Sequence, residues 1–583
     1  MSTFVKVGVV GLGTMGAGIA EVLARGGLDV VGIEIDDDAL ARGRAHLESS
    51  TGRAVKRGRL TQEAQAEILD RITLSTAFAD LSDRDLVIEA VPERLELKRR
   101  VFAELDKVCR PDAVLATNTS SLSVTDIAVT TDRPTAIVGV HFFNPAPVMK
   151  LVEVIGTVLT EPAALTGVTE LVRGLGKVPV TIGDRAGFVA NRLLFGYLNQ
   201  AVTMYDSGHA SREDIDTAMR LGTGVPMGPL TLLDLIGLDT SLEVLEAIYR
   251  ESRDHRHAPA PILRELVTAG LLGRKNGRGL YTYEKPGSAV VVDTPAATPA
   301  PVVERPLVGV AGSGRLAVRI IETCARAGAD VRFVASDDAE VKRAWLTLEE
   351  SLDRSLTDGT LDEPTKKAAL ERVTGGPEPS RLAECDLIIE AVAEDTPGQR
   401  SALAAIGELA KPDAILATTS STTSVIERAM AIGRPASVIG LHFAALPGDA
   451  GKPGNKPGNV VEVVCTAVSS AEVADRAAAL AGLLGLVPVR CRDRAGFIID
   501  ALRFPYLNDA ARMLEAGYAD ADSIDAAMTL GCGYPAGPIA ELDRLGPDVA
   551  TGVLRALHAE SREPALAPAP LLEEYATAGR TLR

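Results

Sequence analysis

A histidine and a glutamate, His141 and Glu153, interrupt two neighbouring apolar stretches of the sequence. Residues 136–140 and 150–155 have the composition of short buried strands, and the Asn-Pro-Ala-Pro segment at 144–147 predicts a turn between them. Two strands joined in this way could bring the imidazole and the carboxylate together. A carboxylate at one ring nitrogen fixes the tautomer, so the other nitrogen can take a proton from a substrate hydroxyl. The pair is therefore a candidate general base.

Considered alone, the same residues also fit a purely structural interpretation, in which the histidine is buried in the core with its hydrogen bonds satisfied and the glutamate lies on an edge strand. Two further features of the sequence favour the catalytic interpretation. One is a nucleotide-binding signature that begins at Gly11, and the other is a second copy of the pair, at His442 and Glu462.

The nucleotide signature lies where an apolar strand pattern, Val5–Val10, runs into Gly11-Leu12-Gly13-Thr14-Met15-Gly16. Glycine permits the tight turn and the close approach of a pyrophosphate, and the N-terminus of the following helix faces the phosphates. A second strand pattern, Asp29–Ile35, carries Glu34 at the distance expected for an acid that binds the adenosine ribose diol. Because a carboxylate there opposes a 2′-phosphate, the sequence predicts a site for NAD in preference to NADP.

Two polar clusters accompany the predicted sheet. An Asn-Thr-Ser-Ser cluster at 118–121 follows the strand pattern of 113–116. In a parallel sheet the carboxyl ends of the strands form the ligand edge, so we expect this cluster near the ligand. A basic cluster, Lys-Arg-Gly-Arg at 56–59, lies within a helical pattern over 38–70. It fits a solvated helix end as well as a phosphate contact.

Composition limits the class of protein. The chain of 583 residues is too long for one hydrophobic core and predicts about three to five domains. A net charge of -17 argues against a nucleic acid or an anionic membrane as partner. The six cysteines show no CxxC spacing, so neither a disulfide framework nor a metal site is indicated. With no transmembrane-length apolar run and no signal-peptide pattern, the sequence predicts a cytoplasmic protein.

The patterns predict a duplicated α/β plus all-α fold, in which a Rossmann-type doubly wound sheet is followed by a helical domain, twice. The peptide at 87–91 recurs at 388–392, and Asp-Arg-Ala-Gly-Phe at 184–188 recurs at 493–497. The predicted units are an NAD-binding domain (1–183), a helical substrate and pairing domain (184–284), a linker (285–305), a degenerate Rossmann-type domain (306–492) and a truncated helical domain (493–583).

Together these features resemble the 3-hydroxyacyl-CoA dehydrogenase family, well over residues 4–284 and in decayed form over 306–580. The specific part is His-Phe-Phe-Asn-Pro at 141–145 with Leu-Val-Glu-Val at 151–154. The resemblance implies an NAD-dependent enzyme that reversibly oxidises a 3-hydroxyacyl-CoA, expected to be of short chain such as 3-hydroxybutyryl-CoA, to the 3-ketoacyl-CoA. It also implies a place in fatty acid β-oxidation.

The resemblance also implies a role for each matching residue. The implied catalytic set is the base His141, its orienting partner Glu153, and Ser120 and Asn191 at the substrate oxygen and the imidazole. The implied NAD-binding set is Gly11, Gly13, Thr14, Met15, Gly16, Glu34, Glu93, Lys98 and Asn118, with Glu93 and Lys98 along the nicotinamide half. The implied substrate-binding set is Ser50, Arg57, Ser120 and Asn144, with Ser50 and Arg57 near the CoA phosphates.

The second copy keeps His442, Glu462, Glu394 and Ser421. It departs from the first copy at the ribose-binding acid (Ala335), the third glycine (Ala317), the Phe-Asn-Pro peptide (Ala444-Ala445-Leu446), the lysine (Gln399) and the asparagine (Asp500). Changes at several contact positions compound, so we expect weak or no dehydrogenase activity and a structural role.

Family members pair through their helical domains, so the resemblance implies an intramolecular pseudo-dimer in which the second half completes the substrate cleft of the first. Further association of whole chains is left open. Two other functions also stay open at this point. One is a dehydrogenase of a CoA-free hydroxy acid of the gulonate type, and the other is a non-catalytic protein that binds CoA or a nucleotide.

Overall fold

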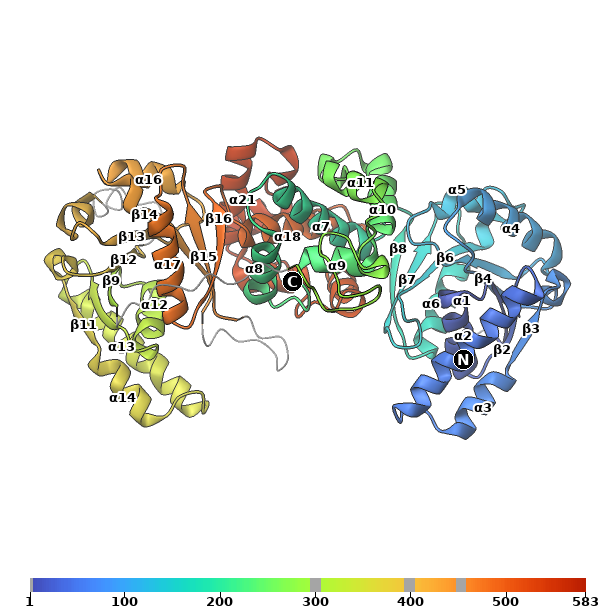
Figure 1. Ribbon diagram of the computed structural model, residues 1–583. Coiled ribbons are helices and arrows are strands. Elements are labelled where there is room, and N and C mark those ends of the chain that lie inside the picture. The colour runs from blue at the N-terminus through green and yellow to red at the C-terminus, as the bar shows by residue number, and fades with distance from the viewer. Residues whose placement is uncertain (1–3, 294–305, 393–403, 447–457) are drawn as a thin grey trace.

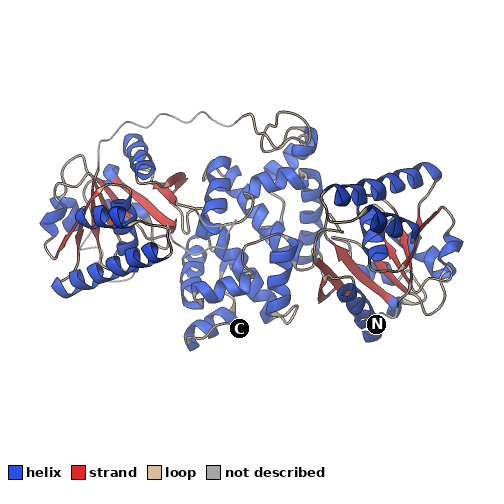
Figure 2. Ribbon diagram, turned by 90° about the horizontal axis from the view of Figure 1, so that it is seen from below, coloured by secondary structure: helices blue, strands red, loops and turns tan. Residues whose placement is uncertain are grey.

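The computed structural model describes residues 4–293, 306–392, 404–446 and 458–583. Figure 1 shows two α/β lobes on either side of a central helical part, with the first lobe at the right and the second at the left. In Figure 2 the helices of the centre form one block between the two sheets. The duplicated arrangement predicted from the sequence, a sheet domain followed by a helical domain, is confirmed.

The first lobe contains an eight-stranded sheet with the strand order β3-β2-β1-β4-β5-β6-β7-β8. Its strands are β1 (Lys6–Val10), β2 (Asp29–Ile33), β3 (Ile72–Ser75), β4 (Leu86–Glu89), β5 (Val114–Thr117), β6 (Ile137–Phe142), β7 (Leu151–Gly156) and β8 (Val178–Gly183). β6 and β7 pair antiparallel, and the other neighbours pair parallel. All residues of β4 and β5 are buried, as in a sheet covered by helices on both faces.

The helices of the first lobe are α1 (Thr14–Arg25), α2 (Asp37–Lys56), α3 (Gln62–Asp70), α4 (Leu95–Val108), α5 (Val124–Ala128) and α6 (Pro162–Gly174). The helical pattern expected over 38–70 is two helices. Gly58 adopts a φ of 66°, which ends a helix, and the Thr61 hydroxyl caps α3 by accepting the Ala64 N–H. The basic cluster at 56–59 therefore lies at the turn between α2 and α3.

The first helical domain consists of α7 (Ala190–Asp206), α8 (Arg212–Thr223), α9 (Pro229–Ile236), α10 (Leu238–Ser252) and α11 (Pro261–Thr268). It follows β8 directly. The first residues of α7 consequently lie beside the edge of the sheet that carries β6 and β7, which places a helix start next to the candidate base pair.

The second copy repeats this order, with the sheet β11-β10-β9-β12-β13-β14-β15-β16. Its strands are β9 (Leu307–Ala311), β10 (Asp330–Val334), β11 (Val373–Gly376), β12 (Leu387–Glu390), β13 (Ile415–Thr418), β14 (Val438–Ala445), β15 (Val460–Cys465) and β16 (Val487–Arg492). Its lobe helices are α12 (Arg315–Arg326), α13 (Asp338–Thr357), α14 (Glu363–Glu371), α16 (Val425–Ala431) and α17 (Ala471–Leu483). Its helical domain contains α18 (Ile499–Glu515), α19 (Ala521–Ala526), the π-helical turn η7 (Ala527–Gly531), α20 (Pro538–Leu545), α21 (Pro547–Ser561) and α22 (Pro570–Ala578).

The two helical domains share one apolar core, to which Leu198 of α7 and Leu507 of α18 both belong. Each helical domain also contacts the sheet of the other copy. From α8, the Leu221 carbonyl accepts the N–H of Gly458, and from the second copy the Tyr518 hydroxyl donates to the Gly183 carbonyl at the end of β8. The two copies are therefore joined reciprocally across the centre of the molecule.

None of the helices in the described part of the chain combines the length and the apolar character that a membrane crossing needs.

Candidate active site

His141 and Glu153 lie directly opposite each other in the antiparallel register of β6 and β7. Their side chains meet with 2.8 Å between Nδ1 and Oε2, and both residues are buried. A carboxylate can only accept, so Nδ1 carries the proton of the neutral imidazole and Nε2 is left as an acceptor. The geometry is that of a base whose tautomer is fixed by its partner.

The second oxygen of Glu153 is bound by the start of α7. Its Oε1 accepts the N–H groups of Val189 at 3.1 Å and of Ala190 at 3.0 Å. These donors are free because the first N–H groups of a helix have no partner within it. Sequence reasoning missed them, since a backbone donor leaves no mark in the residue types.

The other ring nitrogen faces polar and aromatic groups. Ser120 Oγ lies 3.1 Å from His141 Nε2, and the rings of Phe143 and Phe188 lie 4.6 Å and 5.7 Å from the imidazole between centroids. Asn191, the second residue of α7, is partly exposed and its amide has no hydrogen-bond partner among the described residues. A substrate oxygen at Nε2 would therefore meet a hydroxyl and find an amide available on the adjoining helix.

Glu93 and Asn118 hold the backbone around this point. Glu93 Oε1 accepts the N–H groups of Ser120 at 2.9 Å and Ser121 at 3.0 Å, and Asn118 Oδ1 accepts the Phe142 N–H at 2.9 Å. Burial raises the pKa of Glu93, but the Lys98 charge and the hydrogen bonds outweigh it and hold the pKa below its ordinary value. Glu93 is consequently an anion that positions the loop carrying Ser120.

Lys98 is almost fully buried on α4. Its ammonium lies 2.8 Å from Glu89 Oε1 and 3.4 Å from Glu93 Oε2. Two carboxylates of the protein therefore pair with this ammonium. Lys98 helps to position the loop that carries Ser120 through its ion pair with Glu93.

The glycine loop fits a dinucleotide. Gly11 has a φ of 87°, and a methyl group on Gly16 would collide with the Gly11 carbonyl oxygen, so the turn requires glycine at both positions. A Cβ on Gly13 would meet nothing within 4 Å, which leaves the backbone open to a pyrophosphate. Thr14 and Met15 begin α1, whose N-terminus favours an anion.

Glu34 follows β2, and its Oε1 accepts the Leu12 N–H at 2.5 Å. The carboxylate thus lies against the glycine loop, on the edge where a ribose diol would bind. The residues present are those that would hold NAD.

The expected CoA contacts lie apart from the base pair. Ser50 is on α2 and Arg57 immediately follows it, with an exposed side chain. Asn144 lies beyond β6 and is exposed. Within the described part of the chain, no hydrogen bond links these three residues to His141 or Glu153.

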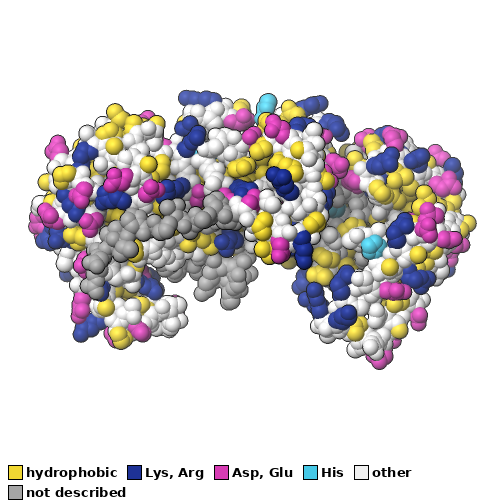
Figure 3. Space-filling model, viewed as in Figure 1, with side chains coloured by type: hydrophobic (Ala, Val, Ile, Leu, Met, Phe, Trp, Pro, Cys, Tyr) yellow, Lys and Arg dark blue, Asp and Glu magenta, His cyan; other side chains and the backbone are white. Residues whose placement is uncertain are grey.

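The second copy also borders the first site. A Cβ on Gly531, at the end of η7, would lie 2.7 Å from Leu151 Cδ2 and 3.3 Å from Phe143 Cε1. The next residue is Cys532, where burial and the charge of Glu153 raise the pKa of the thiol to about 12. Figure 3 shows the surface hollowed between the central helical part and the first lobe at the right.

The second copy keeps the base pair but not its surroundings. His442 Nδ1 lies 2.5 Å from Glu462 Oε2. Asp500 replaces the asparagine, and its Oδ2 accepts the Ser421 hydroxyl at 2.8 Å and lies 3.7 Å from His442 Nε2. A carboxylate thus stands where the first copy has a neutral amide.

The remaining differences of the second copy are at its nucleotide loop and its buried acid. Gly312 has a φ of 141°, and the Ala317 methyl lies 3.4 Å from the point where a Cβ on Gly312 would stand. Arg428 pairs with Glu390 at 2.8 Å, where the first copy uses Lys98. Glu394, which the second copy was expected to keep, and Gln399, which was expected to replace the lysine, both lie outside the described residues.

Known proteins resemble this chain in sequence and in fold. The 3-hydroxybutyryl-CoA dehydrogenase of Clostridioides difficile is 45% identical over 280 residues, which are 48% of this chain and 100% of the relative. The human mitochondrial hydroxyacyl-coenzyme A dehydrogenase is 42% identical over 285 residues, 48% of this chain and 91% of that protein. The crystal structure of 3-hydroxybutyryl-CoA dehydrogenase from Escherichia coli K12 covers 99% of both chains with a TM-score of 0.71 and 28% identity.

Two family models each match the chain twice. The one described as "3-hydroxyacyl-CoA dehydrogenase, NAD binding domain" matches residues 6–185 and 307–494. The one described as "3-hydroxyacyl-CoA dehydrogenase, C-terminal domain" matches 187–283 and 496–583. The chain therefore belongs to the 3-hydroxyacyl-CoA dehydrogenase family of NAD-dependent oxidoreductases, as a tandem duplication of the family's two domains.

Proposed function

We propose that the first copy alone oxidises short-chain (S)-3-hydroxyacyl-CoA, such as 3-hydroxybutyryl-CoA, to the 3-ketoacyl-CoA. The observation that carries this proposal is the His141–Glu153 pair, with Ser120 at the free ring nitrogen and a complete glycine loop in the same domain. Relatives named 3-hydroxybutyryl-CoA dehydrogenase, 45% and 46% identical over 280 residues, support the short chain. A role in fatty acid β-oxidation belongs to the same proposal.

His141 Nε2 takes the proton of the 3-hydroxyl, and the Glu153 carboxylate stabilises the imidazolium that forms. Ser120 and Asn191 hold the substrate oxygen, and in the reverse direction the imidazolium returns the proton. The glycine loop and Glu34 would hold NAD, which would supply the acceptor for the hydride from C3. Because Glu153 is held by the helix start at Val189 and Ala190, the base keeps its position only when the sheet and the helical domain are docked.

We further propose that Glu34 binds the adenosine ribose of NAD and that Ser50 and Arg57 contact the CoA phosphates. Glu93, Lys98 and Asn118 act on the nicotinamide side by fixing the loop that carries Ser120. The hydrogen bonds of Glu93 to the loop, its ion pair with Lys98 and the hydrogen bond of Asn118 to Phe142 of β6 support this role.

The second copy is proposed to be a structural partner that forms an intramolecular pseudo-dimer with the first. The shared helical core and the contacts of Gly531 with Leu151 and Phe143 support this proposal. The proposed domain limits are 1–183, 184–284, 306–492 and 493–583, and a cytoplasmic location stays a prediction.

The test is NADH oxidation with acetoacetyl-CoA by the full-length protein and by its His141→Gln and His442→Gln variants under identical conditions. We expect His141→Gln to lose about 10²–10⁴-fold in turnover while keeping NADH binding, and His442→Gln to remain near the parent. Equal losses in both variants would assign catalysis to both copies. A parent that reduces free keto acids but not acetoacetyl-CoA would instead indicate the gulonate type, and NADH binding without any turnover would indicate a binding protein.

A further inference from the structure

Two equivalent pockets lie where the helical domains of the two copies meet. A shift of 309 residues, given by the match of Asp184 with Asp493, converts the positions of one pocket into those of the other. The first, here called the arginine pocket, has a volume of about 150 Å³ and is lined by Arg192, His257 and Arg512 among others. The second, here called the opposite pocket, has a volume of about 340 Å³.

The arginine pocket contains buried nitrogen atoms that lack partners. His257 is only 3% exposed, and neither of its ring nitrogens has a hydrogen bond within the described part of the chain. Arg192 Nη1 is likewise buried without a hydrogen bond among the described residues. The nearest carboxylate oxygens are 3.9 Å from His257 Nδ1, on Asp254, and 3.7 Å from Arg192 Nη1, on Glu251. Buried polar groups in folded proteins are normally hydrogen-bonded, so these atoms point to a missing acceptor.

The charges in the arginine pocket favour an anionic acceptor. Its two acids, Asp254 and Asp509, are both bound by Arg256, at 2.7 Å and 2.8 Å. One arginine offsets only one of the two acids, but Arg185, Arg192 and Arg512 also line the pocket. Four arginines therefore face two aspartates, and the net charge of the lining is positive. The volume of about 150 Å³ admits a small oxyanion but not a nucleotide.

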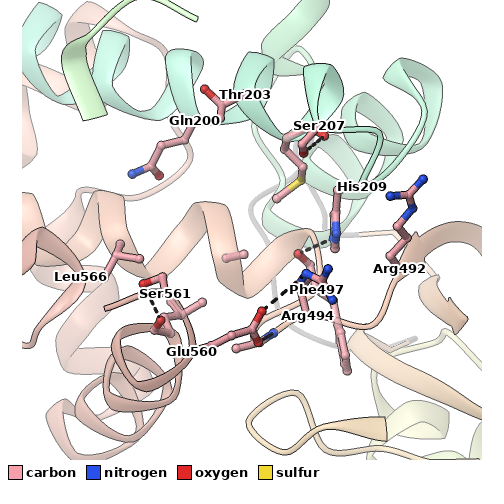
Figure 4. A pocket seen from close by; sticks show the side chains of 14 residues that line it. Gln200, Thr203, Ser207, His209, Arg492, Arg494, Phe497, Glu560, Ser561 and Leu566 are labelled. Carbon is pink, nitrogen blue, oxygen red and sulfur yellow. Dashed lines mark hydrogen bonds and ion pairs between the residues drawn. The ribbon is translucent and has the colours of Figure 1, made fainter. Parts of the chain in front are cut away.

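The opposite pocket shows that the fold itself does not require these cations. Ala501 stands at the position of Arg192, Leu566 at that of His257 and Thr203 at that of Arg512. Figure 4 shows Gln200 of α7 extending toward Leu566 across this pocket. Gln200 Oε1, an acceptor, is buried here without a hydrogen bond among the described residues, so the two pockets suit different occupants.

We propose that the arginine pocket binds one phosphate-class oxyanion between the two copies, held by Arg192 and His257 of the first copy and by the charge of Arg512 of the second. The ion is either free phosphate or a phosphate monoester group on a small molecule. Because it draws on both copies, its binding stabilises their pairing. It also borders α7 one residue after Asn191, which ties the site to the helix that holds Glu153.

The experiment measures thermal unfolding of the full-length protein in rising phosphate at constant ionic strength, with saturating NADH present to fill the glycine loop. We expect a saturable increase in Tm of about 2 °C or more, and one phosphate per chain by calorimetry. Glycerol phosphate in place of phosphate distinguishes a monoester from the free ion: saturation by the monoester alone would assign the site to a phosphorylated small molecule.

Two variants, Arg192→Ala and His257→Leu, each replace a residue of the arginine pocket by the residue at the equivalent position of the opposite pocket. Each should abolish most of the phosphate response, whereas Thr203→Ala, in the opposite pocket, should keep it. Circular dichroism in chloride verifies that each variant folds, and calorimetry on the parent tests the proposal independently. A parent that binds neither phosphate nor glycerol phosphate saturably, or a His257→Leu variant with the parent's full response, would overturn the proposal.

Discussion

In both copies a histidine pairs with a glutamate across two antiparallel strands, and the second oxygen of that glutamate accepts two N–H groups at the start of a helix. The copies differ at one residue of the following helix, since Asp500 Oδ2 lies 3.7 Å from His442 Nε2 and the first copy has Asn191 at the equivalent position. They differ again at the glycine loop. The register of the strands thus preserves the pair by itself, whereas binding of the substrate oxygen and the dinucleotide depends on residues outside that register.

The largest difference in kcat between equivalent substitutions in the two copies should come from replacing their glutamates. Glu153→Gln leaves an oxygen for the Val189 and Ala190 N–H groups but removes the charge that stabilises the imidazolium, so kcat should fall by about 10²-fold or more. Glu462→Gln should change kcat by less than about twofold. Steady-state assays with acetoacetyl-CoA measure both, and thermal unfolding should show similar stability losses for the two. Equal losses of kcat would contradict the assignment of one working site.

His209 and Tyr518 occupy equivalent positions in the two helical domains, and each hydrogen-bonds to a backbone carbonyl of the other copy, but they should differ in acid sensitivity. His209 Nε2 lies 3.0 Å from the Phe497 carbonyl, and burial lowers the pKa of His209 to about 4, whereas the equivalent Tyr518 does not titrate in this range. In the unfolded chain this histidine has a pKa of about 6.5. Between about pH 6.5 and 4 it is therefore protonated in the unfolded chain but neutral in the folded chain. Stability should therefore fall as the pH drops from about 6.5 to 4, by on the order of 3 kcal/mol from this group.

Chemical unfolding of the parent and of His209→Gln across this pH range isolates that contribution. The variant should be less stable at pH 7 but should lose less stability on acidification. Parallel curves for the two proteins would show that His209 is not the acid-sensitive group.

The glycine loops offer the next comparison. Gly16→Ala would drive a methyl group into the Gly11 carbonyl, whereas the second copy accommodates Ala317 with Gly312 at a φ of 141° instead of 87°. Gly16→Ala should weaken NADH binding by about 10-fold or more, because the pyrophosphate needs the undistorted turn. Ala317→Gly should leave NADH binding unchanged. Fluorescence titration with NADH measures both affinities. Unaltered NADH binding by Gly16→Ala would show that the glycine loop is not part of the NADH site.

Much of this arrangement follows from local pattern. Alternating apolar strands and helices predicted the duplicated fold, and the apolar context of His141 and Glu153 placed them on adjoining strands. The break at Gly58 was missed because the helical periodicity resumes in α3. The donors at Val189 and Ala190 and the neighbour Gly531 were also missed, since they depend on how domains dock, and residue types carry no record of that docking.

The smallest expected effect tests whether the second copy completes the first site. A methyl group on Gly531 would press on Leu151 and Phe143, beside His141, while one on the equivalent Gly222 would press on Ile499 Cδ1 at 2.5 Å, beside the second pair. The two substitutions to alanine are therefore matched in their crowding but differ in which site they disturb. Gly531→Ala should lower kcat/KM for acetoacetyl-CoA by about 3-fold to 10-fold, because a displaced Phe143 alters the surroundings of the imidazole. Gly222→Ala should lose comparable stability in thermal unfolding with little change in kcat/KM. If both variants lost activity in proportion to stability, the second copy would stabilise the fold without shaping the cleft.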